Sequence, residues 1–160
     1  MTVDTTKSFT VITQFIQDET SLDTLSAIRR FYVQNNTIVP NSESLIEKNP
    51  GNELTPEFCT AQKQAFEDDD FFKSKGGFEK LSEAVAGEMV LVISLGDDHY
   101  SHMLWLDSLY PPYDEEGTGP GRERGSCGIE SGEPEYLVNN QGYNEVVFSN
   151  LRFGPVGSTF

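Results

Sequence analysis

The sequence lacks the features that mark several large classes of protein. A membrane-spanning helix needs about 18 consecutive apolar residues, whereas the longest apolar stretch here is residues 89–93. Residues 1–7 contain no apolar segment behind a basic start, so the sequence shows no signal peptide. Basic residues are few, with 11 Lys and Arg against 26 Asp and Glu and a net charge of −15. Because so acidic a chain repels phosphate groups, we expect neither nucleic acid nor a membrane as its partner.

Cysteine is also scarce. Cys59 and Cys127 are the only two, and neither has a histidine or a second cysteine at the spacing of a zinc site, so we expect no metal. The pair can be two buried free thiols of a cytosolic protein, or one disulfide worth roughly 4 kcal/mol. The triplet Asn35-Asn36-Thr37 is an N-glycosylation sequon, which favours an extracellular chain.

The sequence shows no motif for a cofactor. Residues 117–125 have neither the P-loop nor the dinucleotide-binding glycine pattern, so we expect no cofactor. Residues 97–102 contain two aspartates and both histidines of the chain, but adjacent aspartates of an extended chain point to opposite faces. A turn at the end of a strand explains this cluster better than a metal site does. The acidic run 67–70 lacks the glycine and the final glutamate of a calcium loop.

Hydrophobic periodicity predicts a mainly β protein. The length of 160 residues suits one domain and is short for two. The segment 89–95 is apolar on both faces, so we expect a buried strand there. The predicted strands are residues 8–16, 25–34, 37–39, 89–95 and 145–153, with a turn at Asn35-Asn36.

Two helices are expected beside these strands. Thr55 and Pro56 form a helix start, because a hydroxyl caps the first turn and proline suits the first helical position. We expect this helix to run to about Phe66, where the acidic run 67–70 ends it. A shorter helix fits residues 78–86. Residues 111–125, rich in proline, glycine and acids, are predicted to form a long exposed loop.

The residues close to Trp105, the only tryptophan, are of types that suit sugar binding. Tyr100, Tyr110 and Tyr113 are close in the sequence. A sugar ring presents an apolar face of C–H groups, for which the flat indole is a good partner. An arginine beside such a ring supplies donors in a fixed fork that can reach sugar hydroxyls. The alternative is that Trp105 is a core residue of a β protein.

Many short motifs in register resemble the cellobiohydrolases of glycoside hydrolase family 7. Among them are Arg30-Phe-Tyr-Val-Gln-Asn, Met103-Leu-Trp-Leu-Asp-Ser and Arg124-Gly-Ser-Cys. They follow one another in the order of that family and extend over nearly all of the chain. The full set is residues 4–7, 10–15, 30–35, 40–43, 59–62, 75–78, 89–95, 97–100, 103–108, 124–127, 131–134 and 148–159.

The resemblance implies part of a concanavalin-like β-jelly-roll sandwich with one or two short helices. Residues 1–160 would form a single partial domain, the C-terminal part of a family 7 catalytic domain, with no separate cellulose-binding module. Members are secreted enzymes that cleave β-1,4-glucosidic bonds of cellulose with retention, and the full-length enzyme is expected to be a monomer. The implied ligand is cellulose or a cello-oligosaccharide.

The resemblance also implies catalytic carboxylates that this sequence does not contain. The family supplies them from a Glu-x-Asp-x-x-Glu strand that precedes the matching region. Residues 67–72 fit two of the three acids of this pattern and lack the last. We therefore expect no catalytic residue in this chain, and a fragment that is inactive alone.

Five residues match positions that bind substrate in the family. By resemblance, Trp105 is the sugar platform on the product side, and Arg124 and Arg30 are product-side arginines. Asp97 corresponds to an acid that lines the cleft, and Tyr100 to the tyrosine at a loop tip that helps to close the tunnel.

Two further positions bear on this comparison. Cys59 and Cys127 match a disulfide pair of the family, by resemblance. At Gly96 the family usually has a tryptophan platform on the substrate side, so we expect weaker or altered binding there. The alternatives to a cellobiohydrolase fragment are an open-cleft endoglucanase parent and a non-catalytic glucan-binding jelly roll.

Overall fold

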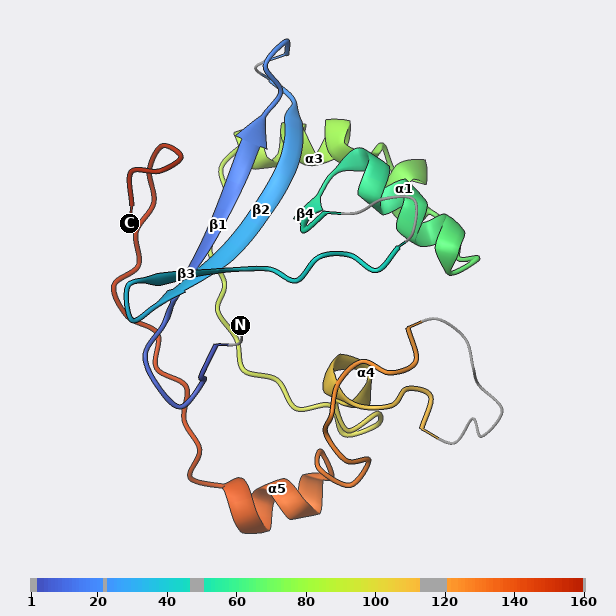
Figure 1. Ribbon diagram of the computed structural model, residues 1–160, viewed down its shortest axis with the longest axis vertical. Helices are drawn as coiled ribbons and strands as arrows, with labels where there is room; N and C mark the ends of the chain where they lie inside the picture. Colours follow the sequence, from blue (N-terminus) through green and yellow to red (C-terminus); the bar gives the residue numbers. More distant parts are fainter. Residues whose placement is uncertain (1–2, 22, 47–50, 113–120, 160) are drawn as a thin grey trace. The chain divides into compact units, whose positions relative to one another are not determined.

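The structure, a computed structural model, describes residues 3–21, 23–46, 51–112 and 121–159 (Figure 1). Its contacts divide the chain into two compact units, each of which is described by itself. The first unit is Met1–Val90 with Arg152–Phe160, and the second is Leu91–Leu151. No helix among the described residues has the length and apolar character needed to cross a membrane.

An antiparallel sheet forms the centre of the first unit (Figure 1). In this sheet β2 is paired with β1, β3 and β4. The predicted strands 8–16, 25–34 and 37–39 are thereby confirmed to within about two residues at each end. The strands are β1 (Thr10–Gln17), β2 (Leu25–Gln34), β3 (Thr37–Pro40) and β4 (Glu53–Leu54).

The turn between β2 and β3 lies where the sequence predicts it. Asn35 and Asn36 have φ angles of 51° and 59°. A two-residue hairpin whose central residues both have positive φ matches the right-handed twist of its strands, and asparagine tolerates this conformation. Asn35 is exposed at this turn, and its glycosylation stays a prediction.

Three helices follow the sheet in the first unit. α1 (Pro56–Ala65) begins as predicted, because the Thr55 side chain accepts a hydrogen bond from the Phe58 N–H at 3.1 Å. α3 (Gly77–Ala86) is the predicted shorter helix. Between them, α2 (Phe71–Ser74) was not predicted, and its cap is Asp70, which accepts from the Lys73 N–H at 2.9 Å.

A buried hydroxyl joins α3 to β2. Ser82 is buried, and its Oγ accepts a hydrogen bond from the Leu25 N–H at 2.8 Å while it donates to the Phe78 carbonyl. Leu25 and Phe78 are themselves buried. Phe78 also packs edge-to-face on Phe72 of α2, with ring centroids 5.8 Å apart. The buried Leu25 N–H therefore has a side-chain acceptor on α3.

The described residues of the second unit contain two short helices, α4 (Leu104–Asp107) and α5 (Pro134–Gln141). After α4 the chain returns antiparallel to itself, with Leu109 opposite Glu123. Neither helix was predicted from the sequence. The loop predicted for residues 111–125 lies largely outside the described residues.

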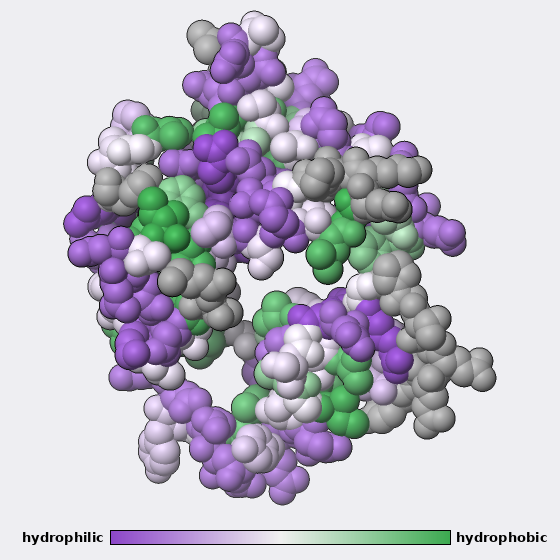
Figure 2. Space-filling view, viewed as in Figure 1, coloured by the Kyte–Doolittle hydropathy of each residue, from purple (hydrophilic) through white to green (hydrophobic). Residues whose placement is uncertain are grey.

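Two predicted strands are wrong. Residues 89–95 and 145–153 form no strand, and most of their apolar side chains are exposed. A strand needs a partner for its N–H and C=O groups, and neither segment is paired with a strand of the described chain. Apolar side chains accordingly lie among hydrophilic ones on the surface drawn in Figure 2. The apolar pattern of these two segments therefore indicates that they can form strands only where a partner strand is available.

We expect Ser82→Ala to lower the free energy of unfolding by about 1–3 kcal/mol, because the buried Leu25 N–H then loses its acceptor. Urea unfolding of the variant measures this. The matched control is Ser74→Ala, which removes an exposed helical hydroxyl that donates only to the Phe71 carbonyl. Equal losses in the two variants would contradict the role given to Ser82.

We also expect the chain to self-associate through residues 89–95, since an extended apolar segment without a ladder partner is a template for strand pairing. Val92→Lys should reduce association, measured by light scattering against protein concentration. Val138→Lys is the matched control, because Val92 and Val138 are 77% and 75% exposed but Val138 lies on a helix. If both variants reduce association equally, general hydrophobicity is the cause and strand pairing is not.

Candidate functional site

Trp105 lies on α4 in the second unit. Leu104 points inward and is buried, whereas Trp105 is 41% exposed. The residue before the helix, Met103, has a positive φ of 60°, and so does His102 at 52°. Two consecutive non-glycine residues in this region cost free energy and occur where surrounding contacts impose them. The indole is thus presented at the surface by a constrained turn.

The side chain of Asp98 links this turn to the indole. Its Oδ1 accepts hydrogen bonds from the N–H groups of Tyr100 and Ser101 at 3.0 and 3.1 Å. Its Oδ2 accepts from Trp105 Nε1 at 2.7 Å. The Ser101 N–H bond, followed by the Trp105 bond, lowers the pKa of Asp98, so this carboxylate is charged at neutral pH.

Arg124 lies on the segment that runs antiparallel to the chain after α4, and its side chain is hydrogen-bonded to α4. Its Nη1 donates to the Trp105 carbonyl at 3.0 Å, and its Nε donates to the Gly121 carbonyl at 2.8 Å. Its guanidinium lies 5.1 Å from the centre of the Tyr110 ring, within the range of a cation–π contact. A guanidinium has five N–H donors, so these contacts leave others available to a ligand.

The backbone around α4 is closely packed. Ser108 is fully buried, and its Oγ donates to the Cys127 carbonyl at 2.6 Å. The Arg124 N–H donates to the Ser108 carbonyl at 2.9 Å. A Cβ at Gly125 would lie 2.2 Å from the Asp107 carbonyl oxygen, so only glycine fits there without a shift of the backbone. These contacts keep Arg124 beside Trp105.

The remaining predicted binding residues are exposed. Asp97 and Tyr100 flank Asp98 in the second unit, and Tyr100 is almost fully exposed. Arg30 lies on β2 of the first unit, where its Nε donates to Asn41 Oδ1 at 3.4 Å. At Gly96 an added Cβ would meet no atom within 4 Å, so the backbone leaves room for a side chain there.

Sequence reasoning favoured Asp97 and missed the contact that Asp98 makes. A signal was available in the segment 98–101. An aspartate followed by residues that can donate their backbone N–H groups is typical of an Asx turn, and a partly buried indole N–H needs an acceptor. The pairing of these two features could not be assigned without the backbone path through His102 and Met103.

Both cysteines are free thiols in the structure, so the disulfide is not formed in it. Cys59 lies on α1 in the first unit, and Cys127 is an exposed residue of the second. Burial, with the charge of Asp70 nearby, raises the pKa of the Cys59 thiol and disfavours the reactive thiolate. The disulfide stays a prediction from the resemblance.

Besides Asp98, Glu133 of the second unit also has a shifted pKa. A side-chain hydrogen bond with Glu130 and the negative charge of Glu130 raise the pKa of Glu133, because both favour its protonated form. The two carboxyl groups of a retaining glycosidase are about 5–5.5 Å apart, so that a sugar carbon fits between them. Glu130 and Glu133 do not belong to a Glu-x-Asp-x-x-Glu pattern, so they are not assigned as that catalytic pair.

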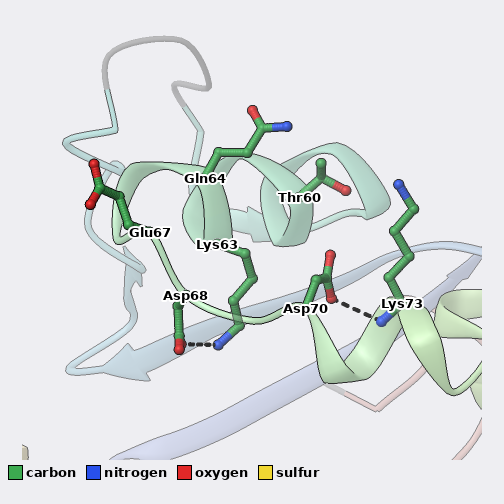
Figure 3. Close-up of a pocket in the computed structure, with 7 residues that line it drawn as sticks. All are labelled: Thr60, Lys63, Gln64, Glu67, Asp68, Asp70 and Lys73. Carbon is green, nitrogen blue, oxygen red and sulfur yellow. Dashed lines mark hydrogen bonds and ion pairs between the residues drawn. The ribbon is translucent and has the colours of Figure 1, made fainter.

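A charged hollow lies on the surface of the first unit (Figure 3). Its volume is about 280 Å³. Lys63 points toward Asp68 and forms an ion pair with it at 2.5 Å, and Asp70 caps α2. No aromatic ring lines it, so it offers no platform for a sugar. The lining residues are Thr60, Lys63, Gln64, Glu67, Asp68, Asp70 and Lys73. Within the described part of the chain, no three His, Cys, Asp or Glu residues are grouped as metal ligands.

Comparison with known proteins identifies the family. The chain matches the model of glycosyl hydrolase family 7 over residues 1–160. It is similar to a family 7 cellobiohydrolase from Daphnia pulex, with 41% identity and a TM-score of 0.76 over 86% of this chain and 31% of that one. It is also similar to the Melanocarpus albomyces cellobiohydrolase complexed with cellotetraose, with 38% identity and a TM-score of 0.80 over 98% of this chain and 34% of that one. A double mutant of the Humicola insolens endocellulase has 31% identity and a TM-score of 0.79, over 99% of this chain and 35% of that one.

These matches confirm the predicted fold class. The antiparallel sheet with its short helices corresponds to part of the mainly β jelly roll of the family 7 structures. The chain spans about a third of the length of each of these solved proteins, 31% to 35%. Because the family model matches the whole chain and the Daphnia pulex enzyme is 41% identical to it, this chain belongs to glycosyl hydrolase family 7.

Proposed function

We propose that this chain carries part of the binding side of a cellulose-degrading hydrolase, with Trp105 and Arg124 as the groups that hold the glucan. The observation that carries the proposal is their direct link, in which Arg124 Nη1 donates to the Trp105 carbonyl at 3.0 Å. An exposed ring face and a cationic fork are thereby presented within one small unit. Similarity to a cellobiohydrolase complexed with cellotetraose supports this assignment.

Each group has a separate part in the proposed binding. The Trp105 ring stacks on the apolar face of a glucose unit, and the free N–H groups of Arg124 donate to its hydroxyls. Asp97 and Tyr100, both exposed close to Trp105 in the sequence, supply an acceptor and a second ring. Arg30 is proposed as a further product-side donor. None of these residues is assigned a catalytic role, so the proposed role is to bind and orient the sugar.

The proposed parent reaction is hydrolysis of β-1,4-glucosidic bonds with retention, in a secreted, monomeric enzyme. That reaction needs one carboxylate to attack the anomeric carbon and a second carboxyl group to protonate the leaving oxygen. The sequence of this chain contains no Glu-x-Asp-x-x-Glu pattern. The residues present therefore provide binding, and the proposal includes no catalytic residue in this chain.

A second candidate function is a glucan-binding protein without catalysis. It is favoured by the fact that the contacts joining Asp98, Trp105 and Arg124 all lie within the second unit. Such a site can bind sugar without contributions from elsewhere. An open-cleft endoglucanase is a third candidate, supported by the similarity to the Humicola insolens endocellulase over 99% of this chain.

We expect the purified chain to show no hydrolysis of a fluorogenic cellobioside above the uncatalysed rate, because the two catalytic carboxylates are not among its residues. Fluorophore release over several days measures this, with a complete family 7 cellobiohydrolase as positive control. Turnover that persists after repeated purification would contradict the assignment of this chain to binding alone.

Trp105→Ala should weaken the binding of cellotetraose by about tenfold or more, because the stacking surface is lost. Isothermal titration calorimetry measures the dissociation constant. Tyr143→Ala is the matched control, since Tyr143 is a fully exposed aromatic residue of the same unit and should leave binding unchanged. If the wild-type chain binds no cellotetraose, or if Trp105→Ala binds it normally, the proposed role of Trp105 is wrong.

A further inference from the structure

We propose that Asp98 is the positioning residue that fixes the orientation of the Trp105 indole. The two oxygens of its carboxylate accept different hydrogen bonds. One oxygen, Oδ1, closes the turn by accepting from the N–H groups of Tyr100 and Ser101. The other, Oδ2, accepts from Trp105 Nε1 at 2.7 Å. The turn therefore needs only Oδ1, and the second oxygen acts on the indole.

This bond holds the one part of Trp105 that the backbone does not. The position of α4 is set by backbone contacts, since the His102 N–H donates to the Asp98 carbonyl at 2.9 Å and the Ser108 N–H to the Leu104 carbonyl at 3.1 Å. Those contacts place the Cα of Trp105 but leave rotation about its two side-chain torsions. The Nε1–H is the only polar group of the indole, so its bond to Asp98 selects one edge and leaves the ring faces accessible.

The bond is strong for an exposed site because the acceptor is charged. A hydrogen bond to an ionised carboxylate is shorter and roughly twice as strong as one between neutral groups. A partly exposed indole would otherwise sample several rotamers, and ordering it would weaken sugar binding. Asp98 thus orders the ring before the ligand arrives. This consequence for binding rests on the proposed function, whereas the orientation of the ring does not.

Asparagine at position 98 separates the two tasks. In Asp98→Asn the amide oxygen can still close the turn, but the other terminal atom becomes an NH₂ donor facing the indole N–H. Two donors cannot bond, so the ring is released while the turn remains. Asp98→Ser provides a second variant, because the serine hydroxyl can close the turn but is too short to reach the indole.

The experiment uses the fact that the chain has one tryptophan. In the ¹H–¹⁵N NMR spectrum of the full chain without ligand, we expect the single indole N–H resonance to shift upfield by several tenths of a ppm in both variants. Its exchange with water should also become faster. Acrylamide quenching of the fluorescence should increase by about twofold. Glu135→Gln, which removes an exposed charge of the same unit, is the control and should leave all three unchanged.

The amide resonances of Tyr100 and Ser101 report whether the turn persists. An indole that is unaffected in a variant whose turn persists would overturn the proposal. For cellotetraose we expect binding to weaken by about five- to tenfold in Asp98→Asn, and we expect this effect to vanish when Trp105 is already phenylalanine. If the indole is released but the wild-type chain binds no cellotetraose, the positioning role stands and the proposed function fails.

Discussion

Backbone pairing is the constraint on which the rest of the fold depends. A strand keeps its N–H and C=O groups out of water only when a neighbour accepts and donates in turn. In the first unit β2 is paired with β1, β3 and β4, and its side chains Leu25 and Ala27 are buried. Residues 89–95 are more apolar than β2, yet they form no strand and remain exposed. Hydrophobicity alone therefore does not decide where the sheet forms.

The second unit is organised by polar contacts and has little apolar core. Leu104 is its one buried apolar side chain among the described residues. The chain is held instead by the turn at Asp98, the buried hydroxyl of Ser108 and the short antiparallel return that carries Arg124. Such contacts are directional, so they set the orientation of the indole and guanidinium more sharply than apolar packing would. That property suits a site which must present a ring and a cationic fork at fixed positions.

Local signals in the sequence were sufficient for part of this structure. The Thr55-Pro56 start, the Asn35-Asn36 turn and the first strands depend on residues close in sequence, and each was predicted within about two residues. The failures at 89–95 and 145–153 concern pairing with distant strands, which no local pattern encodes. The same difference between local signals and the path of the backbone explains which parts of the site were predicted. The sequence singled out Trp105, but its bond to Asp98 depends on two positive φ angles at His102 and Met103.

Binding and catalysis make different demands on the length of a chain. The contacts among Asp98, Trp105 and Arg124 lie within residues 98–124, so a short chain can contain the whole arrangement. Retaining hydrolysis instead needs two carboxyl groups about 5–5.5 Å apart. The surrounding structure must hold both groups at this separation. A chain that spans about a third of its solved relatives can therefore contain all the residues of the proposed sugar platform. Under the proposed function, recognition of the glucan depends on contacts that are local in the sequence, whereas cleavage requires structure around two carboxyl groups.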